Sequence, residues 1–171
     1  MSPTTTHRST FAGLAIAAAL SATAAPSLAA GRVEVSYPPG PPYADAGDGV
    51  VEVERTQRVL AEHLRALSSR LPADQSLQVQ VLDIDLAGEL QYFWPQRVRV
   101  MGLGADSPHL HLRYELRRGD TVLAAGEDWI SDPGYLWRSG RPDEQGALHH
   151  ERRMVDDWFE SKLATHAAAL R

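Results

Sequence analysis

The sequence predicts an α+β domain in which a mostly antiparallel sheet of four to five strands packs one face against two helices, as a two-layer sandwich. Three observations lead to this prediction. Several segments alternate apolar and polar residues, which is typical of strands with one solvated face. Two longer segments carry apolar residues at helical spacing. The order along the chain is strand, helix, three or four strands, helix, without an apparent internal repeat.

Residues 1–29 have the features of a cleaved signal peptide. A short basic stretch precedes the apolar segment 11–25, and the small residues Ser27 and Ala29 suit a signal peptidase. We expect cleavage after Ala29 or one residue later, which leaves residues 30–171 as a single domain. This leader predicts a soluble periplasmic protein. Its apolar segment, of about 15 residues, is too short for a typical membrane span.

Composition narrows the classes of function. The net charge of −5 argues against nucleic acid or an anionic membrane as the main partner, because both need a basic face. The chain contains no cysteine, which excludes a lipid anchor on cysteine, thiol catalysis and cysteine-ligated zinc. After the leader, no segment is long and apolar enough to predict a membrane span.

The first predicted strand is residues 33–37, and the proline-rich residues 38–42 form a stiff connection. A helix is predicted from about Val51 to Leu71, where Leu71-Pro72 ends it. Thr56 and His63 flank its apolar stripe. That stripe consists of Val53, Leu60, Leu64, Leu67 and Leu71.

The second strand begins near Leu77, and its alternation slips by one residue at Val81-Leu82. A β-bulge there would place Asp83 and Asp85 together on the face opposite Ile84. The segment 88–108 is harder to interpret. We expect residues 92–95 to form a loop and residues 97–101 to form a strand.

A hairpin follows, with its turn at Arg118-Gly119-Asp120 and its second strand from Thr121 to Ile130. Its predicted core face carries Leu110, Leu112, Tyr114 and Leu116, and its wet face carries His109, His111, Arg113, Glu115 and Arg117. A loop from Ser131 to about Arg141 precedes the last predicted helix. That helix runs from Asp143 or Glu144 to Leu170, with Leu148, Met154, Val155, Trp158, Phe159, Leu163 and Leu170 on or at the edge of its stripe.

Four ordered blocks of sequence resemble the domain of unknown function 3016 family. They are residues 33–37 with 43–46, residues 82–89, residues 130–132 with Tyr135, and residues 151–159. The resemblance covers essentially the whole predicted mature chain. It implies a small exported protein of a Gram-negative bacterium, and it carries no activity, cofactor or catalytic residue onto any position.

Two pairs of residues could carry chemistry. Asp83 and Asp85 project from one strand face about 7 Å apart, a spacing that could bind a cation or form an acid/base pair. Alternatively, they are solvated residues at a strand end. His109 and His111 could chelate zinc or copper if a third ligand converged on them. Glu115 lies on the same face, and the partner strand offers Glu127 or Asp128. His149 and His150 point about 100° apart on a helix, so they do not easily join one site.

Glu151 should be partly buried beside Val155 and Trp158, so it needs a partner. Arg97, Arg99 or Arg152 could supply an ion pair, and an active-site role for Glu151 is the alternative. Trp158 and Phe159 at helical spacing indicate core residues. Residues 153, 157 and 160 are expected to face away from the core.

These observations favour a non-enzymatic periplasmic protein, a small binding or envelope-accessory module. Its expected working surfaces are the open sheet face and the loop with Tyr135 and Trp137. The alternative is a metal-dependent hydrolase that uses Asp83, Asp85 and the histidines. The sequence assigns no catalytic, cofactor-binding or metal-ligating residue, and it leaves open whether the partner is a protein or a small molecule.

Overall fold

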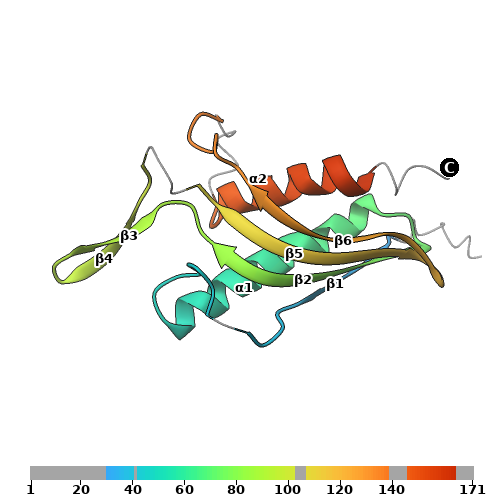
Figure 1. Cartoon of the computed structure of the whole chain (residues 1–171), viewed down its shortest axis with the longest axis horizontal. Coiled ribbons are helices and arrows are strands. Elements are labelled where there is room, and N and C mark those ends of the chain that lie inside the picture. The colour runs from blue at the N-terminus through green and yellow to red at the C-terminus, as the bar shows by residue number, and fades with distance from the viewer. Residues whose placement is uncertain (1–29, 41, 103–106, 139–145, 165–171) are drawn as a thin grey trace, which may run out of the picture.

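The computed structural model describes residues 30–40, 42–102, 107–138 and 146–164. These residues form a four-stranded sheet of order β1-β2-β5-β6 and a separate two-stranded sheet of β3 and β4. Both helices cover one face of the larger sheet, and the β3–β4 hairpin extends away from one end of it (Figure 1). The predicted α+β architecture is confirmed. The predicted signal peptide, residues 1–29, lies outside the described residues.

The strands are β1 (Arg32–Ser36), β2 (Gln75–Asp85), β3 (Glu89–Phe93), β4 (Gln96–Val100), β5 (His109–Arg118) and β6 (Thr121–Ser131). The helices are α1 (Val50–Ala66), the 3-10 turn η1 (Leu67–Arg70), α2 (His149–Trp158) and its continuation η3 (Phe159–Leu163), which is π-helical. Among the described helices, none is long and apolar enough to cross a membrane.

Strand β1 pairs in parallel with β2, and α1 makes the connection between them. The other neighbours in the larger sheet are antiparallel. The apolar stripe predicted for α1 is confirmed, since Leu60 and Leu64 are fully buried against the sheet and Leu67 follows in η1. The α-helix itself ends at Ala66, and the tighter turn η1 completes the predicted segment before Pro72.

The register shift predicted in β2 is present between Val81 and Asp83. Before the shift, Leu77, Val79 and Val81 face the helices; after it, Ile84 does. The shift therefore keeps apolar residues in the core along the whole strand.

The core lies between the larger sheet and the two helices. From the sheet it contains Leu77, Val79, Val81, Ile84, Leu110, Leu112 and Leu116. From the helices it contains Leu60, Leu64, Leu67, Met154, Val155, Trp158, Phe159 and Leu163. Trp158 and Phe159 are core residues, as predicted, and the ring of Tyr114 meets the Trp158 ring edge-on at 5.4 Å.

Two predicted boundaries are wrong. Tyr92 and Phe93 belong to β3, which pairs with β4 around a tight turn at Trp94 and Pro95, so residues 92–95 are not a loop throughout. The last helix begins at His149 and not at residue 143 or 144. Leu148 has a left-handed backbone (φ 57°), which prevents the helix from continuing towards the N-terminus. Residues 139–145 and 165–171 lie outside the described part of the chain.

Candidate functional site

The face of the larger sheet opposite the helices is polar. His109, His111, Arg113, Glu115 and Arg117 of β5 all belong to it, as the alternation of the sequence predicts. The tight turn after β5 is also confirmed, and Gly119 has the positive φ (53°) that such a turn favours. This open face is therefore a continuous surface across β2, β5 and β6.

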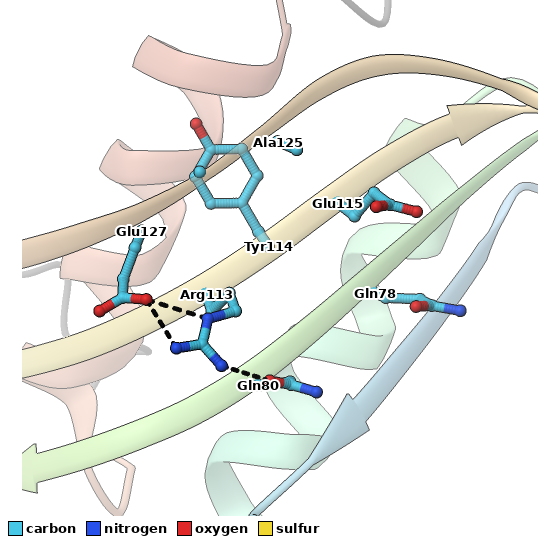
Figure 2. Close-up of a pocket in the computed structure, with 8 residues that line it drawn as sticks. Gln78, Gln80, Arg113, Tyr114, Glu115, Ala125 and Glu127 are labelled. Atoms are coloured by element: carbon cyan, nitrogen blue, oxygen red, sulfur yellow. Dashed lines mark hydrogen bonds and ion pairs between the residues drawn. The ribbon is translucent and has the colours of Figure 1, made fainter.

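A chain of charged and polar contacts crosses the three strands at the middle of this face. The Arg113 guanidinium donates from Nε to Glu127 Oε2 at 2.9 Å, and its Nη2 lies 2.8 Å from the same oxygen. On the other side, Arg113 Nη1 donates to Gln80 Oε1 at 3.3 Å. Figure 2 shows Arg113 between Glu127 of β6 and Gln80 of β2. Each side chain is held by its neighbour, which reduces the conformational entropy lost when a ligand binds.

A hollow of about 500 Å³ lies over this chain of contacts. Its polar lining consists of Gln78, Gln80, Arg113, Glu115 and Glu127, and Tyr114, Ala125 and Gly126 complete it. The lining carries one cationic and two anionic side chains together with two amides, so it offers both hydrogen-bond donors and acceptors. The hydrogen bond from Arg113 and the nearby His111 lower the pKa of Glu127, so Glu127 is ionised at neutral pH.

An aromatic pair borders the hollow. The rings of His111 and Trp129 stack with centroids 3.9 Å apart, and His111 Nε2 lies 2.7 Å from Glu127 Oε1. Trp129 remains 67% exposed. The face thus combines a ring available for stacking with fixed polar groups, an arrangement that small-molecule sites use.

The two histidines of the metal hypothesis contact different carboxylates. His111 lies against Glu127, whereas His109 Nδ1 is 4.0 Å from Asp85 Oδ2. Asp83 accepts hydrogen bonds from the backbone N–H groups of Ala44 and Ile84, both at 2.9 Å. Within the described residues, no group of three or more histidine, aspartate or glutamate side chains is arranged to hold a metal ion.

The sequence did not predict the surroundings that Asp85 and Asp128 have in the structure. Partial burial is the main cause that raises the pKa of Asp85 above its usual value. The negative charges of Asp45 and Asp83 raise this pKa further, by less. Asp128 faces the helices and not the open face. It accepts a hydrogen bond from Trp158 Nε1 at 3.0 Å and lies 3.4 Å from Lys162 Nζ. Of the two acidic residues considered opposite the histidines, Glu127 lies beside His111, and Asp128 lies on the other face of the sheet.

His149 and His150 are the first two residues of α2. Although consecutive residues of a helix point about 100° apart, their ring centroids lie only 3.7 Å from each other. Burial, together with the charges of His149 and Arg153, lowers the pKa of His150 to about 4. Nearby, His149 also helps to line a hollow of about 250 Å³ between α1 and α2.

Glu151 is buried (3% exposed), as predicted, but its partner is a backbone group. Its Oε1 accepts a hydrogen bond from the N–H of Ala87 at 2.8 Å, just after the end of β2. Two of the three predicted partners contact other groups. Arg99 donates to the carbonyl oxygens of Ala87 and Gly88, and Arg97 pairs with an exposed aspartate.

Two ion pairs near the end of the larger sheet were not predicted from the sequence. Arg99 holds Asp45 through two contacts of 2.8 and 2.9 Å. The buried Asp132 lies 3.1 Å from Nη2 of Arg153, a residue that we expected to face away from the core. The motif Asp132-Pro133-Gly134 does signal a turn, and Asp132 accepts from the Gly134 N–H as such turns require. Nothing in the local sequence indicates that the arginine comes from α2.

The loop after β6 divides into a buried and an exposed part. Tyr135 is buried, with its ring edge-on to His150 at 4.7 Å, so its expected role on a binding surface is wrong. The Asp132 turn directs the Tyr135 ring inward, towards α2. Trp137 is exposed and remains available.

Fold and site together define the class: a small two-layer α+β domain with one helix-covered face and one open polar face. The chain belongs to the DUF3016 family of proteins of unknown function, whose family model matches residues 31–161. The resemblance found in the sequence is thereby confirmed. Neither the curated proteins nor the solved structures gave a match to this chain.

Apart from residues 33–37, which belong largely to β1, parts of all four blocks that carried this resemblance meet in space at one end of the larger sheet. Asp45 donates its N–H to Ile84 O and accepts from the N–H of Leu86, at 2.9 and 3.0 Å. The contact of Asp132 with Arg153 joins the other two blocks. These contacts fix the end of the sheet from which the β3–β4 hairpin leaves.

Proposed function

We propose that this chain is an exported, periplasmic, non-enzymatic protein that binds a small polar molecule on the open face of its sheet. The observation that carries the proposal is the hollow of about 500 Å³ over β2, β5 and β6, in which part of the polar lining is held by hydrogen bonds. The Glu127–Arg113–Gln80 contacts support it, because they orient donors and acceptors before a ligand arrives.

Export rests on the first 29 residues of the sequence, with their basic start, apolar segment and small residues near Ala29. The test is fractionation of cells that express the full chain, followed by N-terminal sequencing. We expect a periplasmic species that begins at Ala30 or Gly31. A cytoplasmic protein that retains residues 1–29 would contradict the proposal.

Ligand binding is tested by NMR on isotope-labelled protein with the small-molecule fraction of a periplasmic extract. We expect shifts in the side-chain amide signals of Gln78 and Gln80 and in the indole N–H of Trp129. The variant Arg113→Ala should not show these shifts, because without the guanidinium neither Gln80 nor Glu127 is held in place over the sheet. The matched control Arg32→Ala, an exposed arginine of β1, should retain them. Unmoved signals in the native protein, or equal shifts in both variants, would contradict a site over Arg113.

A further inference from the structure

The tip of the β3–β4 hairpin carries three consecutive exposed aromatic side chains. Tyr92, Phe93 and Trp94 are 61%, 55% and 84% exposed. The hairpin extends away from the larger sheet, so its tip lies at an extremity of the structure (Figure 1). Clustered apolar surface of this kind marks an interaction site more often than scattered single residues do.

Contacts along β4 tie the hairpin to the body of the domain. Arg97, which pairs with Tyr92 next to the tip, has its Nη1 2.9 Å from Asp48 Oδ1. Arg99, nearer the base, forms the pair with Asp45 described above. At the start of β3, Gly88 has φ +78°, and a Cβ there would meet Val100 O at 2.6 Å. The close approach of the two strands holds the tip in a defined position.

Two features of the tip suit the membrane–water interface. First, residues 90–96 contain no charged side chain, so contact with lipid there desolvates no charge. Second, β3 and β4 pair with each other through Phe93↔Gln96 and Tyr92↔Arg97, which satisfies the backbone groups that face each other. The groups on the two outer edges need other partners, which water and lipid headgroups supply at the interface.

We propose that this hairpin docks the protein onto a lipid bilayer, with Phe93 and Trp94 in the headgroup region and the sheet remaining in water. Tryptophan and tyrosine favour that region because one part of each ring system is apolar and another part donates a hydrogen bond. The projecting tip suits a soft, deformable surface. Arg97 and Arg99 are already paired with carboxylates, and the chain carries a net charge of −5, so the attraction is apolar and not directed at anionic lipid.

The experiment uses the mature chain and vesicles of phosphatidylcholine, with binding measured by co-sedimentation. We expect the native protein to bind equally well at low salt and at about 0.5 M salt, where surface charges are screened. The affinity of the double variant Phe93→Ala/Trp94→Ala for the vesicles should fall by about ten-fold or more, because the variant lacks two large apolar side chains. The matched control Trp137→Ala removes another exposed tryptophan, 77% exposed on the loop after β6, and should bind like the native protein.

A second measurement locates the contact. With brominated acyl chains in the vesicles, tryptophan fluorescence should be quenched in the native protein and in Trp137→Ala. The variant Trp94→Phe should still bind within about three-fold, since it keeps an aromatic ring, but should lose most of the quenching. Circular dichroism spectra matching the native one establish that the variants fold.

Three results would overturn the proposal. The native protein could fail to bind phosphatidylcholine vesicles, which would favour the groove of a partner protein as the receptor of the tip. Binding could require anionic lipid and disappear in salt, which would indicate a charged surface elsewhere. The double variant could bind as well as the native protein. None of these outcomes depends on the hollow over the sheet, so this proposal and the ligand site are tested separately.

Discussion

The hydrogen bond between Glu151 and the end of β2 allows a quantitative prediction for the variant Glu151→Ala. The carboxylate is 3% exposed and accepts the N–H of Ala87, which is itself buried, at 2.8 Å. Leaving that N–H unpaired costs about 1–3 kcal/mol, and the space vacated by the side chain costs about 1–2 kcal/mol more. The removal of a buried carboxylate offsets part of this cost. We expect a loss of about 2–4 kcal/mol in the free energy of unfolding.

The isosteric variant Glu151→Gln separates the hydrogen bond from the charge. Its amide oxygen can still accept from Ala87, so it should lose only about 1 kcal/mol. The assay is equilibrium unfolding in urea, with thermal unfolding in parallel, where Glu151→Ala should lower Tm by roughly 6–15 °C. The control Glu62→Ala, an exposed carboxylate on α1, should change stability by less than about 0.5 kcal/mol.

Two results would refute this reasoning. If Glu151→Ala were as stable as the native protein, the bond to Ala87 would contribute nothing to stability. If the glutamine and alanine variants lost equal stability, the contribution of Glu151 to stability would come from its negative charge and not from the hydrogen bond that it accepts from Ala87.

Three further predictions concern other parts of the fold. The variant Arg153→Met should lose about 2–4 kcal/mol of stability in urea unfolding, because it leaves the buried carboxylate of Asp132 with less compensating charge. Stability should fall as the pH drops from about 6.5 to about 4, since the lowered pKa of His150 means that the unfolded chain binds its proton more strongly in that range. The variant His150→Gln should flatten this part of the urea-midpoint profile. The variant Gly88→Ala should lose about 1–3 kcal/mol, because its Cβ would press on Val100 O at a positive φ, and amide exchange in the hairpin should rise.

Each of these predictions has a contrary result. A stability of Arg153→Met equal to that of the native protein would show that Asp132 is satisfied without it. A His150→Gln profile as steep as the native one would assign the acid sensitivity to other groups. Unchanged exchange in Gly88→Ala would show that the hairpin base tolerates a side chain.

The elements with strong periodicity were predictable because burial itself imposes the pattern. Leu60 and Leu64 revealed the buried face of α1, and the alternation on β5 separated its wet face from its core face. Even the register shift at Val81 was visible, because apolar residues resume on the opposite phase after it. In these segments the local sequence carries the tertiary information.

The start of α2 and the second sheet were less predictable. Nothing in the sequence around Leu148 marks a left-handed residue, since glycine or asparagine usually occupies such a position. Residues 89–92 alternate polar and apolar residues over only four positions, and the apolar run Tyr92-Phe93-Trp94 then breaks the pattern, so the signal for β3 is short. The strand β3 is held by its pairing with β4 and does not bury an apolar face of its own.

The candidate site was predictable as a face but not as a set of contacts. The sequence placed Arg113 and His111 on the open side, because that follows from period two. Which carboxylate each would meet depended on the pairing register between β5 and β6, which brings Glu127 opposite Arg113. The ion pair of Asp132 with Arg153 depended on how α2 docks, which no local pattern encodes.

The parallel pairing of β1 with β2 has a consequence for how the chain assembles. Synthesis begins at the N-terminus, so β1 is made before the other described strands, yet its partner β2 begins at Gln75, after all of α1. The strands β5 and β6, in contrast, are joined by a two-residue turn and can pair as soon as both exist. Val33 and Val35 of β1 must therefore wait, unpaired, for a strand made much later. The first described strand of the sheet to be made therefore stays without its partner while the whole of α1 is synthesised.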